Sequence, residues 1–157
     1  SSKPELWLEP GRSIVGNTTV LLTRVNAVKK THKNFVAVDA GFNLLLRPAM
    51  YSAYHRVVVA NKMDGEAEEV YTIVGPICES GDVLAEHRKL PRVERGDLIA
   101  IFDTGAYGFV MSSQYNGRPR CAEVLVDKDR YYVIREAESY PDLLGKQVLP
   151  ESLLTDF

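Results

Sequence analysis

A thiol and a carboxylate stand side by side in the segment GPICESGD, where Cys78 and Glu79 follow a run of β-branched residues. A thiol can act as a general acid near neutral pH, and a carboxylate can bind a substrate ammonium group. An isolated cysteine after a strand can also be a small hydrophobic residue of the core. These residues alone leave both interpretations open.

The segment LWLEPGRSIV places Glu9, Pro10, Gly11 and Arg12 directly after a short apolar stretch. Glycine lets a ligand approach the backbone closely, and the guanidinium group suits phosphate or carboxylate. This combination indicates an anion-binding site at the end of a strand. The alternative is a Pro-Gly turn flanked by solvated charges.

Arg47 and Tyr51 lie four residues apart, so on a helical turn they would share one face. Together they could bind a carboxylate, or the arginine could simply pack along the tyrosine ring. Tyr107 lies between Gly105 and Gly108, just after a predicted strand. The glycines permit close backbone approach, so its phenol could lie over a ligand or at the rim of a barrel.

The cysteines and histidines do not predict a metal site. Cys78 has no second cysteine nearby, and His87 follows it without a recognisable zinc-ligand spacing. Cys121 is interpreted as a strand residue. His32 and His55 belong to no HExxH or triad-like motif, so the sequence gives no support for a hydrolase.

Composition predicts one globular unit with a core, because the chain has 157 residues of which 45% are hydrophobic. The net charge is −2 and the basic residues are not clustered, so we expect neither nucleic acid nor an anionic membrane as partner. The apolar runs are strand-sized, and the 2 cysteines argue against a disulfide scaffold. We therefore expect a soluble protein in a reducing, cytoplasmic setting.

The sequence pattern predicts many short strands separated by turn residues. A hairpin is predicted from residues 20–28 and 35–40, with further strands over 55–60, 70–74, 98–104, 122–126 and 131–135. Helix is expected only over 44–51, 106–112 and 141–144. This pattern predicts a mainly β fold, a closed or nearly closed antiparallel β-barrel of Greek-key type.

Four motifs in register resemble the C-terminal part of the diaminopimelate decarboxylases: EPGRSIV, VDAGFNLLLRPAMY, GPICESGD and GAYGFVMSSQYNGRPRCAEVLV. These are pyridoxal-phosphate enzymes of the fold type shared with alanine racemase and ornithine decarboxylase. The resemblance runs from Glu9 to about Leu144, with Cys121 standing where proline is expected. It implies that residues 1–12 form the last strand of an N-terminal (β/α)₈ barrel and residues 13–157 a C-terminal β-barrel domain.

The resemblance also implies cofactor-binding residues. Glu9 is expected to face the pyridine nitrogen of pyridoxal 5'-phosphate, where a carboxylate keeps the ring protonated. Pro10, Gly11 and Arg12 complete this cofactor-binding segment, and Tyr107 matches a residue that touches both cofactor and substrate. Arg12 is also expected near a substrate carboxylate. The family's Schiff-base lysine has no counterpart in this sequence, so the chain alone is expected to be inactive.

Substrate-binding roles are implied for Arg47, Tyr51 and Glu79, and the role of proton donor for Cys78. Arg47 would pair with the distal carboxylate of meso-2,6-diaminopimelate while Glu79 takes its ammonium. A substrate without a distal carboxylate would not need that arginine. The implied reaction yields L-lysine and CO₂, the last step of lysine synthesis, in a homodimer with shared active sites.

Two other hypotheses remain open at this point. The chain could belong to a related decarboxylase that acts on another basic amino acid or on a carboxylated polyamine. It could also be a non-catalytic β-barrel that only binds a ligand.

Overall fold

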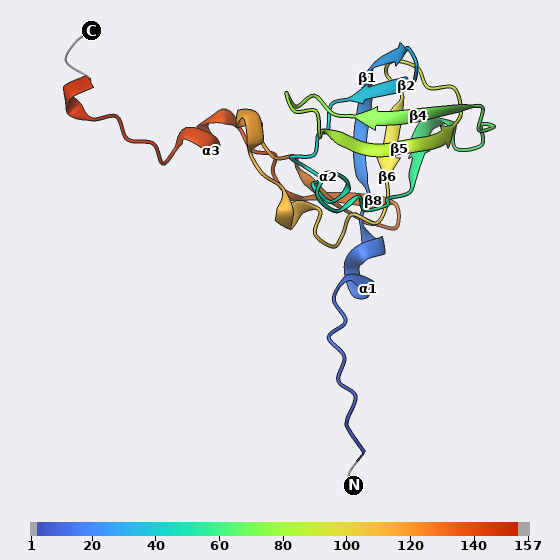
Figure 1. Ribbon diagram of the computed structural model, residues 1–157. Helices are drawn as coiled ribbons and strands as arrows, with labels where there is room; N and C mark the ends of the chain where they lie inside the picture. Colours follow the sequence, from blue (N-terminus) through green and yellow to red (C-terminus); the bar gives the residue numbers. More distant parts are fainter. Residues whose placement is uncertain (1–2, 154–157) are drawn as a thin grey trace. The chain divides into compact units, whose positions relative to one another are not determined.

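The computed structural model describes residues 3–153 of the chain and contains two compact units, Ser1–Ser112 and Ser113–Phe157 (Figure 1). The first is built on a six-stranded sheet and the second on a two-stranded hairpin. The sequence predicted one domain over residues 13–157 and gave no sign of a division after Ser112.

The six strands of the first unit follow the order β3-β6-β1-β2-β4-β5. The two edge strands, β3 and β5, also contact each other, so the sheet nearly closes on itself. This confirms the predicted mainly β barrel with a few short helices. The strands are β1 (Leu21–Lys30), β2 (Asn34–Val38), β3 (Val57–Val59), β4 (Glu69–Val74), β5 (Val83–Leu90) and β6 (Leu98–Ile101).

One pairing differs from the prediction of an antiparallel barrel. Strands β2 and β4 run parallel, with Asn34 opposite Tyr71 and Ala37 opposite Val74. All other pairs in this sheet are antiparallel. A parallel pair needs a long crossover connection, and here the chain passes through a helix and β3 between the two strands. The sheet is therefore mixed.

The inward faces of these strands form one apolar core. Because successive strand residues point to opposite faces, each strand buries alternate positions, as Val36 and Val38 do in β2. The predicted hairpin is present as β1 and β2, joined by a turn in which the Thr31 N–H donates to the Lys33 carbonyl at 3.0 Å. The largest fully buried side chains are Tyr71, Leu45, Ile73, Leu84, Ile99, Ile101, Val25, Val36, Val38, Val59 and Asn43.

The helices are short and differ in part from the prediction. The helix expected over 44–51 begins only at Arg47, because Pro48 favours the first turn of a helix. The helix expected over 106–112 is a single 3-10 turn at Phe109–Met111, preceded by Tyr107 in a left-handed conformation. The α-helices are α1 (Arg12–Val15), α2 (Arg47–Tyr51) and α3 (Tyr140–Leu144); the 3-10 turns are η1 (Gly16–Thr18), η2 (Ala60–Lys62), η3 (Phe109–Met111), η4 (Tyr115–Gly117) and η5 (Glu151–Leu153).

The apolar segment Leu6 to Leu8, expected to be a strand, has no regular secondary structure and is exposed. A strand requires a hydrogen-bonded neighbour. Its assignment to another domain stays a prediction. In residues 3–153, no helix combines the length and the apolar character needed to cross a membrane.

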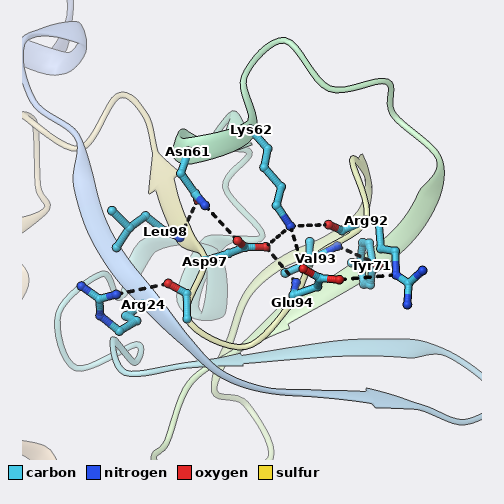
Figure 2. A network of polar contacts seen from close by, with 10 residues as sticks. Arg24, Asn61, Lys62, Tyr71, Arg92, Val93, Glu94, Asp97 and Leu98 are labelled. Atoms are coloured by element: carbon cyan, nitrogen blue, oxygen red, sulfur yellow. Dashed lines mark hydrogen bonds and ion pairs between the residues drawn. The ribbon is translucent and has the colours of Figure 1, made fainter.

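A buried carboxylate ties the loops at one end of the sheet together (Figure 2). Asp97 accepts hydrogen bonds from Lys62 Nζ (2.8 Å), Asn61 Nδ2 (2.9 Å) and the Glu94 N–H (2.8 Å). Burial by itself would raise the pKa of Asp97, but the hydrogen bonds from Lys62 and Asn61 outweigh it and lower that pKa. The bond to Asp97 raises the pKa of Lys62. This network fixes η2 against the turn that leads into β6.

The second unit contains β7 (Glu123–Asp127) and β8 (Arg130–Arg135), an antiparallel hairpin exposed on both faces. Glu138 anchors the segment that returns from it. Its carboxylate accepts from Arg120 Nε (2.7 Å), from Arg120 Nη2, from the Arg120 N–H (2.9 Å) and from Gln114 Nε2 (3.0 Å). The Arg120 side chain, followed by Gln114, lowers the pKa of Glu138 to about 2.

Candidate functional site

The loop that carries Tyr107 is held against the segment that carries Arg12. The Thr104 N–H donates to the Thr19 carbonyl and the Gly105 N–H to the Gly16 carbonyl, both at 3.1 Å. A Cβ added to Gly105 would lie 2.0 Å from the Val15 carbonyl oxygen, so only glycine fits there. The glycine therefore serves the packing of the loop on α1 and η1, whereas the sequence suggested that it gives room to the tyrosine.

The loop then turns sharply at Tyr107. A Cβ on Gly108 would lie 2.2 Å from the Thr104 carbonyl oxygen, which shows how tight the turn is. Tyr107 itself has φ of 62°, in the left-handed region that non-glycine residues seldom adopt. Such a conformation costs on the order of 1–3 kcal/mol and persists where surrounding structure holds it. Its phenol is therefore aimed by the loop rather than by a strand or helix.

The segment after α2 holds the start of the same loop. His55 is buried, and its Nδ1 lies 2.8 Å from the Phe102 carbonyl oxygen. The Phe102 N–H donates to the Arg56 carbonyl at 2.9 Å, and the Arg56 guanidinium lies 3.9 Å from the Phe102 ring centroid. These contacts attach the exit of α2 to the entry of the Tyr107 loop.

Two arginines and two tyrosines meet as a result. The guanidinium carbon of Arg47 lies 5.5 Å from the Tyr107 ring centroid and 5.6 Å from that of Tyr51. The guanidinium carbon of Arg12 lies 5.6 Å from the Tyr107 ring centroid. The spacing of Arg47 and Tyr51 thus predicted their shared face correctly. The contact with Tyr107 goes beyond packing within α2, because it joins segments far apart in the chain.

This cluster, Arg12, Arg47, Tyr51 and Tyr107, offers donors to an anion. Within residues 3–153, neither of the two guanidinium groups forms a hydrogen bond or an ion pair with a protein side chain. Tyr51 and Tyr107 are 57% and 43% exposed, so a ligand can reach both side chains. Two permanent cations beside two phenols suit a ligand with phosphate or carboxylate groups, and the donor set therefore fits pyridoxal phosphate and an amino-acid substrate.

Cys78 and Glu79 lie on an exposed turn that follows β4. The interpretation of Cys78 as a buried core residue is wrong, because its side chain is exposed. The turn is closed by the Gly75 N–H, which donates to the Asp82 carbonyl, and by the Asp82 N–H, which donates to the Glu79 carbonyl, both at 3.0 Å. A thiol and a carboxylate are thus presented together on a compact turn.

Asp82, which the sequence did not single out, lies beneath this turn. Its side chain is 4% exposed, and its carboxylate accepts from the Ile77 N–H (2.7 Å) and from the Phe42 N–H (2.6 Å). The signal in the sequence was weak, an aspartate after Ser-Gly in a turn. An aspartate in such a sequence is more often a solvated turn residue.

The expected site residues are only partly brought together. Among the described residues, no hydrogen bond, ion pair or ring contact joins Cys78 or Glu79 to the cluster of arginines and tyrosines. Glu9 and Pro10 are exposed and contact none of these side chains through such interactions either. Within residues 3–153, no three His, Cys, Asp or Glu side chains are grouped so that they could hold a metal ion.

Known proteins share both the sequence and the fold. The chain is 80% identical over 154 residues to a diaminopimelate decarboxylase of Archaeoglobus fulgidus, covering 98% of this chain and 37% of the relative. It is 52% identical over 152 residues to that of Methanothermobacter thermautotrophicus, covering 97% and 36%. The structure of diaminopimelate decarboxylase from M. jannaschii in co-complex with L-lysine superposes with a TM-score of 0.86 at 45% identity, covering 96% and 35%.

The chain thus spans little more than a third of the length of the curated relatives it matches, 37% in the first case. Residues 14–105 match the model of the pyridoxal-dependent decarboxylases, C-terminal sheet domain. That match covers all six strands of the first sheet and their connections, including α2 and the turn of Cys78. The chain belongs to this family, and what it contributes is the C-terminal sheet domain of a pyridoxal-dependent decarboxylase.

Proposed function

We propose that this chain is the C-terminal part of an enzyme that decarboxylates meso-2,6-diaminopimelate to L-lysine and CO₂ with pyridoxal phosphate as cofactor. The observation that carries the proposal is the meeting of Arg47 and Tyr107 at 5.5 Å, in a chain 80% identical to a diaminopimelate decarboxylase. The arginine lies in a cluster able to bind an anion. We assign to this arginine, the first residue of α2, the recognition of the part of the substrate that does not react.

Substrate choice depends on the end of the molecule that does not react. Diaminopimelate carries a second amino-acid centre, so a binding site must meet both a distal carboxylate and a distal ammonium. Arg47 is positioned by α2 between two tyrosine rings and pairs with the carboxylate. Glu79, exposed on its turn, takes the ammonium. Ornithine and lysine lack the distal carboxylate and leave the arginine without its partner.

The cofactor is held by residues from the start of the chain and from the Tyr107 loop. Arg12 and Gly11 bind its phosphate, Pro10 shapes the turn, and Glu9 keeps a proton at the pyridine nitrogen. Tyr107 contacts cofactor and substrate together. Pyridoxal phosphate, when bound, supplies the electron sink that accepts the electron pair left by loss of CO₂.

Cys78 supplies the proton that replaces CO₂ at the α-carbon. A general acid must reach the carbon from a fixed position and be accessible to the substrate. The exposed turn provides access, and the hydrogen bonds that close the turn restrict where the thiol can move. Arg12 meets the substrate carboxylate beside Tyr107.

The rest of the active site comes from other parts of the assembly. The Schiff-base lysine belongs to an N-terminal (β/α)₈ barrel, of which residues 1–12 contribute the last strand. Leu6 (86% exposed), Trp7 (84%) and Leu8 (77%) present an apolar surface of the kind that marks a protein contact. A homodimer with shared active sites then brings Cys78 and Glu79 to the cofactor of the other subunit. The enzyme works in the cytoplasm.

Turnover by the full-length enzyme tests this function. CO₂ release from meso-diaminopimelate, ornithine and lysine is measured at equal concentrations, and diaminopimelate should be preferred by at least the value of one charge-assisted bond, about 10-fold. The chain alone should release no CO₂ and keep no cofactor absorption band after desalting. A preference for a diamine-forming substrate would assign the protein to a related decarboxylase instead.

A further inference from the structure

The carboxylate of Asp82 joins two segments that carry different parts of the proposed site. One oxygen, Oδ2, accepts from the Ile77 N–H at 2.7 Å, directly before Cys78. The other, Oδ1, accepts from the Phe42 N–H at 2.6 Å, in the loop that leads into α2. Each oxygen therefore serves a different segment. The two backbone donors, of Phe42 and Ile77, lie 35 residues apart in the chain.

Glycines make the room for this carboxylate. A Cβ on Gly75 would lie 2.3 Å from Asp82 Oδ2, and a Cβ on Gly41 would lie 3.0 Å from the same oxygen. The Cβ on Gly41 would also lie 2.7 Å from Ile77 Cγ1. Both glycines thus let the turn of Cys78 and the loop before α2 approach each other closely, with the buried carboxylate between them.

The chemistry of an aspartate is needed at this position. An ionised carboxylate offers acceptors on both oxygens, whereas the amide of asparagine offers one acceptor and one donor group. Asparagine has almost the same shape but would turn a donor toward one of the two backbone N–H groups. Bonds of an ionised acceptor to backbone N–H groups are among the strong ones in proteins.

We propose that Asp82 is a positioning residue of the decarboxylase site, which fixes the turn of Cys78 and Glu79 relative to the loop that delivers Arg47. The inference rests on the proposed function, because the value of that fixed geometry lies in the roles of these three side chains. In the proposed dimer, Arg47 serves the site of its own subunit, while Cys78 and Glu79 serve the site of the partner. The position of their turn relative to the loop before α2 within one chain therefore sets how the two halves of each shared site align. Cys78 must reach the α-carbon of the substrate in the partner's site.

The test compares Asp82→Asn with a matched control in the full-length, cofactor-loaded enzyme. For Asp82→Asn, kcat/KM for meso-diaminopimelate should fall on the order of 100-fold, with KM raised and kcat lowered together, because small displacements of positioned groups have effects of this size. The cofactor absorption spectrum should be unchanged. Amide exchange in peptides that contain Phe42 and Ile77 should become faster than in the wild type.

The control is Asp97→Asn, which removes the other buried aspartate network (Figure 2). Asp97 is 6% exposed and Asp82 is 4% exposed, and the carboxylate of each accepts a hydrogen bond from a backbone N–H group. Both variants should therefore lose thermal stability. Asp97→Asn should keep kcat and KM within about twofold, because its partners Asn61, Lys62 and Glu94 belong to neither the turn of Cys78 nor the loop before α2, and sites without shared partners act independently. Exchange at Phe42 and Ile77 should match the wild type.

Suppose that Asp82→Asn shows faster amide exchange at Phe42 and Ile77, while its kcat and KM stay within about twofold of the wild type, as in Asp97→Asn. Asp82 then has only a structural role, and the inference is wrong. Unchanged exchange at both amides would overturn the inference as well. Should Asp82→Asn not fold, Asp82→Ser, which keeps a small polar side chain at this position, is measured under the same expectations. If the wild type turns over a different amino acid, the proposed function fails by itself, and the two variants are compared with that substrate.

Discussion

At the residue scale, Arg47 combines a fixed position with a charge that forms no ion pair within residues 3–153. Its guanidinium lies over two tyrosine rings. Cation–π contacts of this kind orient the group but leave its N–H donors available. A ligand carboxylate can therefore bind without displacing a carboxylate of any described residue.

We predict that Arg47→Ala in the full-length enzyme raises KM for diaminopimelate about 10- to 150-fold, because a lost charge-assisted bond costs roughly 1.5–3 kcal/mol. Cofactor binding should stay nearly intact, and discrimination against lysine-like ligands should weaken. The control is Arg88→Ala, which removes another arginine from a tyrosine ring, that of Tyr54 at 4.1 Å. Kinetics of Arg47→Ala within twofold of the wild type would remove the residue from the site.

Single residues were predictable to different degrees. The four-residue spacing of Arg47 and Tyr51 is a property of any helical turn, so local sequence sufficed. The approach of Tyr107 depends on the loop contact between Gly105 and Val15, which no local pattern encodes. Asp82 was missed because its partners are backbone N–H groups, and a backbone donor leaves no mark in the sequence.

At the element scale, the Tyr107 loop depends on one close contact with α1. We predict that Gly105→Ala destabilises the protein by about 1–3 kcal/mol, the usual cost of forcing an extra group into a packed site. The added Cβ would meet the Val15 carbonyl oxygen at 2.0 Å, and backbone cannot move aside as a side chain can. The readout is the midpoint of thermal unfolding.

Gly16→Ala is the matched control for this substitution. Gly16 has helical dihedral angles, φ −55° and ψ −48°, and an added Cβ would approach no atom closer than 3.4 Å. Replacing such a glycine by alanine is neutral or slightly stabilising. An equal loss of stability in both variants would show that the Gly105 contact is not the cause.

In the second unit, the ion pair between Glu138 and Arg120 should make a pH-dependent contribution to stability. In the unfolded chain Glu138 titrates near 4.5, whereas in the folded chain its pKa is about 2. Because the folded pKa is the lower one, its contribution to stability is fully present above pH 4.5 and is lost as the pH falls through about 2. We predict that Glu138→Gln destabilises residues 114–138 at neutral pH and that this difference shrinks as the pH falls from about 4.5 toward about 2.

Amide exchange of peptides from this segment, measured between about pH 2 and 6 after correction for intrinsic rates, checks the prediction. Glu136→Gln, a change at an exposed glutamate in the same segment, serves as control and should leave the profile unchanged. A difference between wild type and Glu138→Gln that stays constant over this range would contradict the assignment.

Most strands were predictable because their β-branched runs and turn residues are local signals. Strand β5 was not, since VLAEHRKL mixes charges with apolar residues, and His87 within it has φ of 54°. The parallel pairing of β2 with β4 could not be predicted either, because it is set by the path of the crossover connection and not by the sequence of either strand. The short α1 follows Pro-Gly, a pair that more often ends elements than begins them.

At the scale of the whole molecule, the chain carries the residues proposed for substrate recognition and proton donation, while the Schiff-base lysine of the proposed enzyme is expected on its N-terminal barrel. The cluster of Arg12, Arg47, Tyr51 and Tyr107 and the turn of Cys78 share no direct contact among the described residues. Two parts of one site that do not touch within a chain can be completed by a second copy. Cyclic dimers achieve this because the same surface of each subunit faces the other.

We predict that Cys78 and Glu79 act in the active site of the partner subunit. Cys78→Ala should lower kcat far more than it weakens substrate binding, since general acids contribute typically 10²- to 10⁴-fold to the rate. Stability should change little, because the thiol is exposed. This variant is then mixed with a second inactive full-length variant that lacks the Schiff-base lysine, under conditions where dimers exchange subunits.

If the sites are shared, each mixed dimer contains one site with both wild-type groups. Random exchange makes half of the dimers mixed, and each has one good site of two, so about a quarter of normal activity should return. Each variant incubated alone is the control and stays inactive. Because exchange is followed independently by mass labelling, activity that remains at zero after complete exchange would mean that Cys78 serves its own subunit or none.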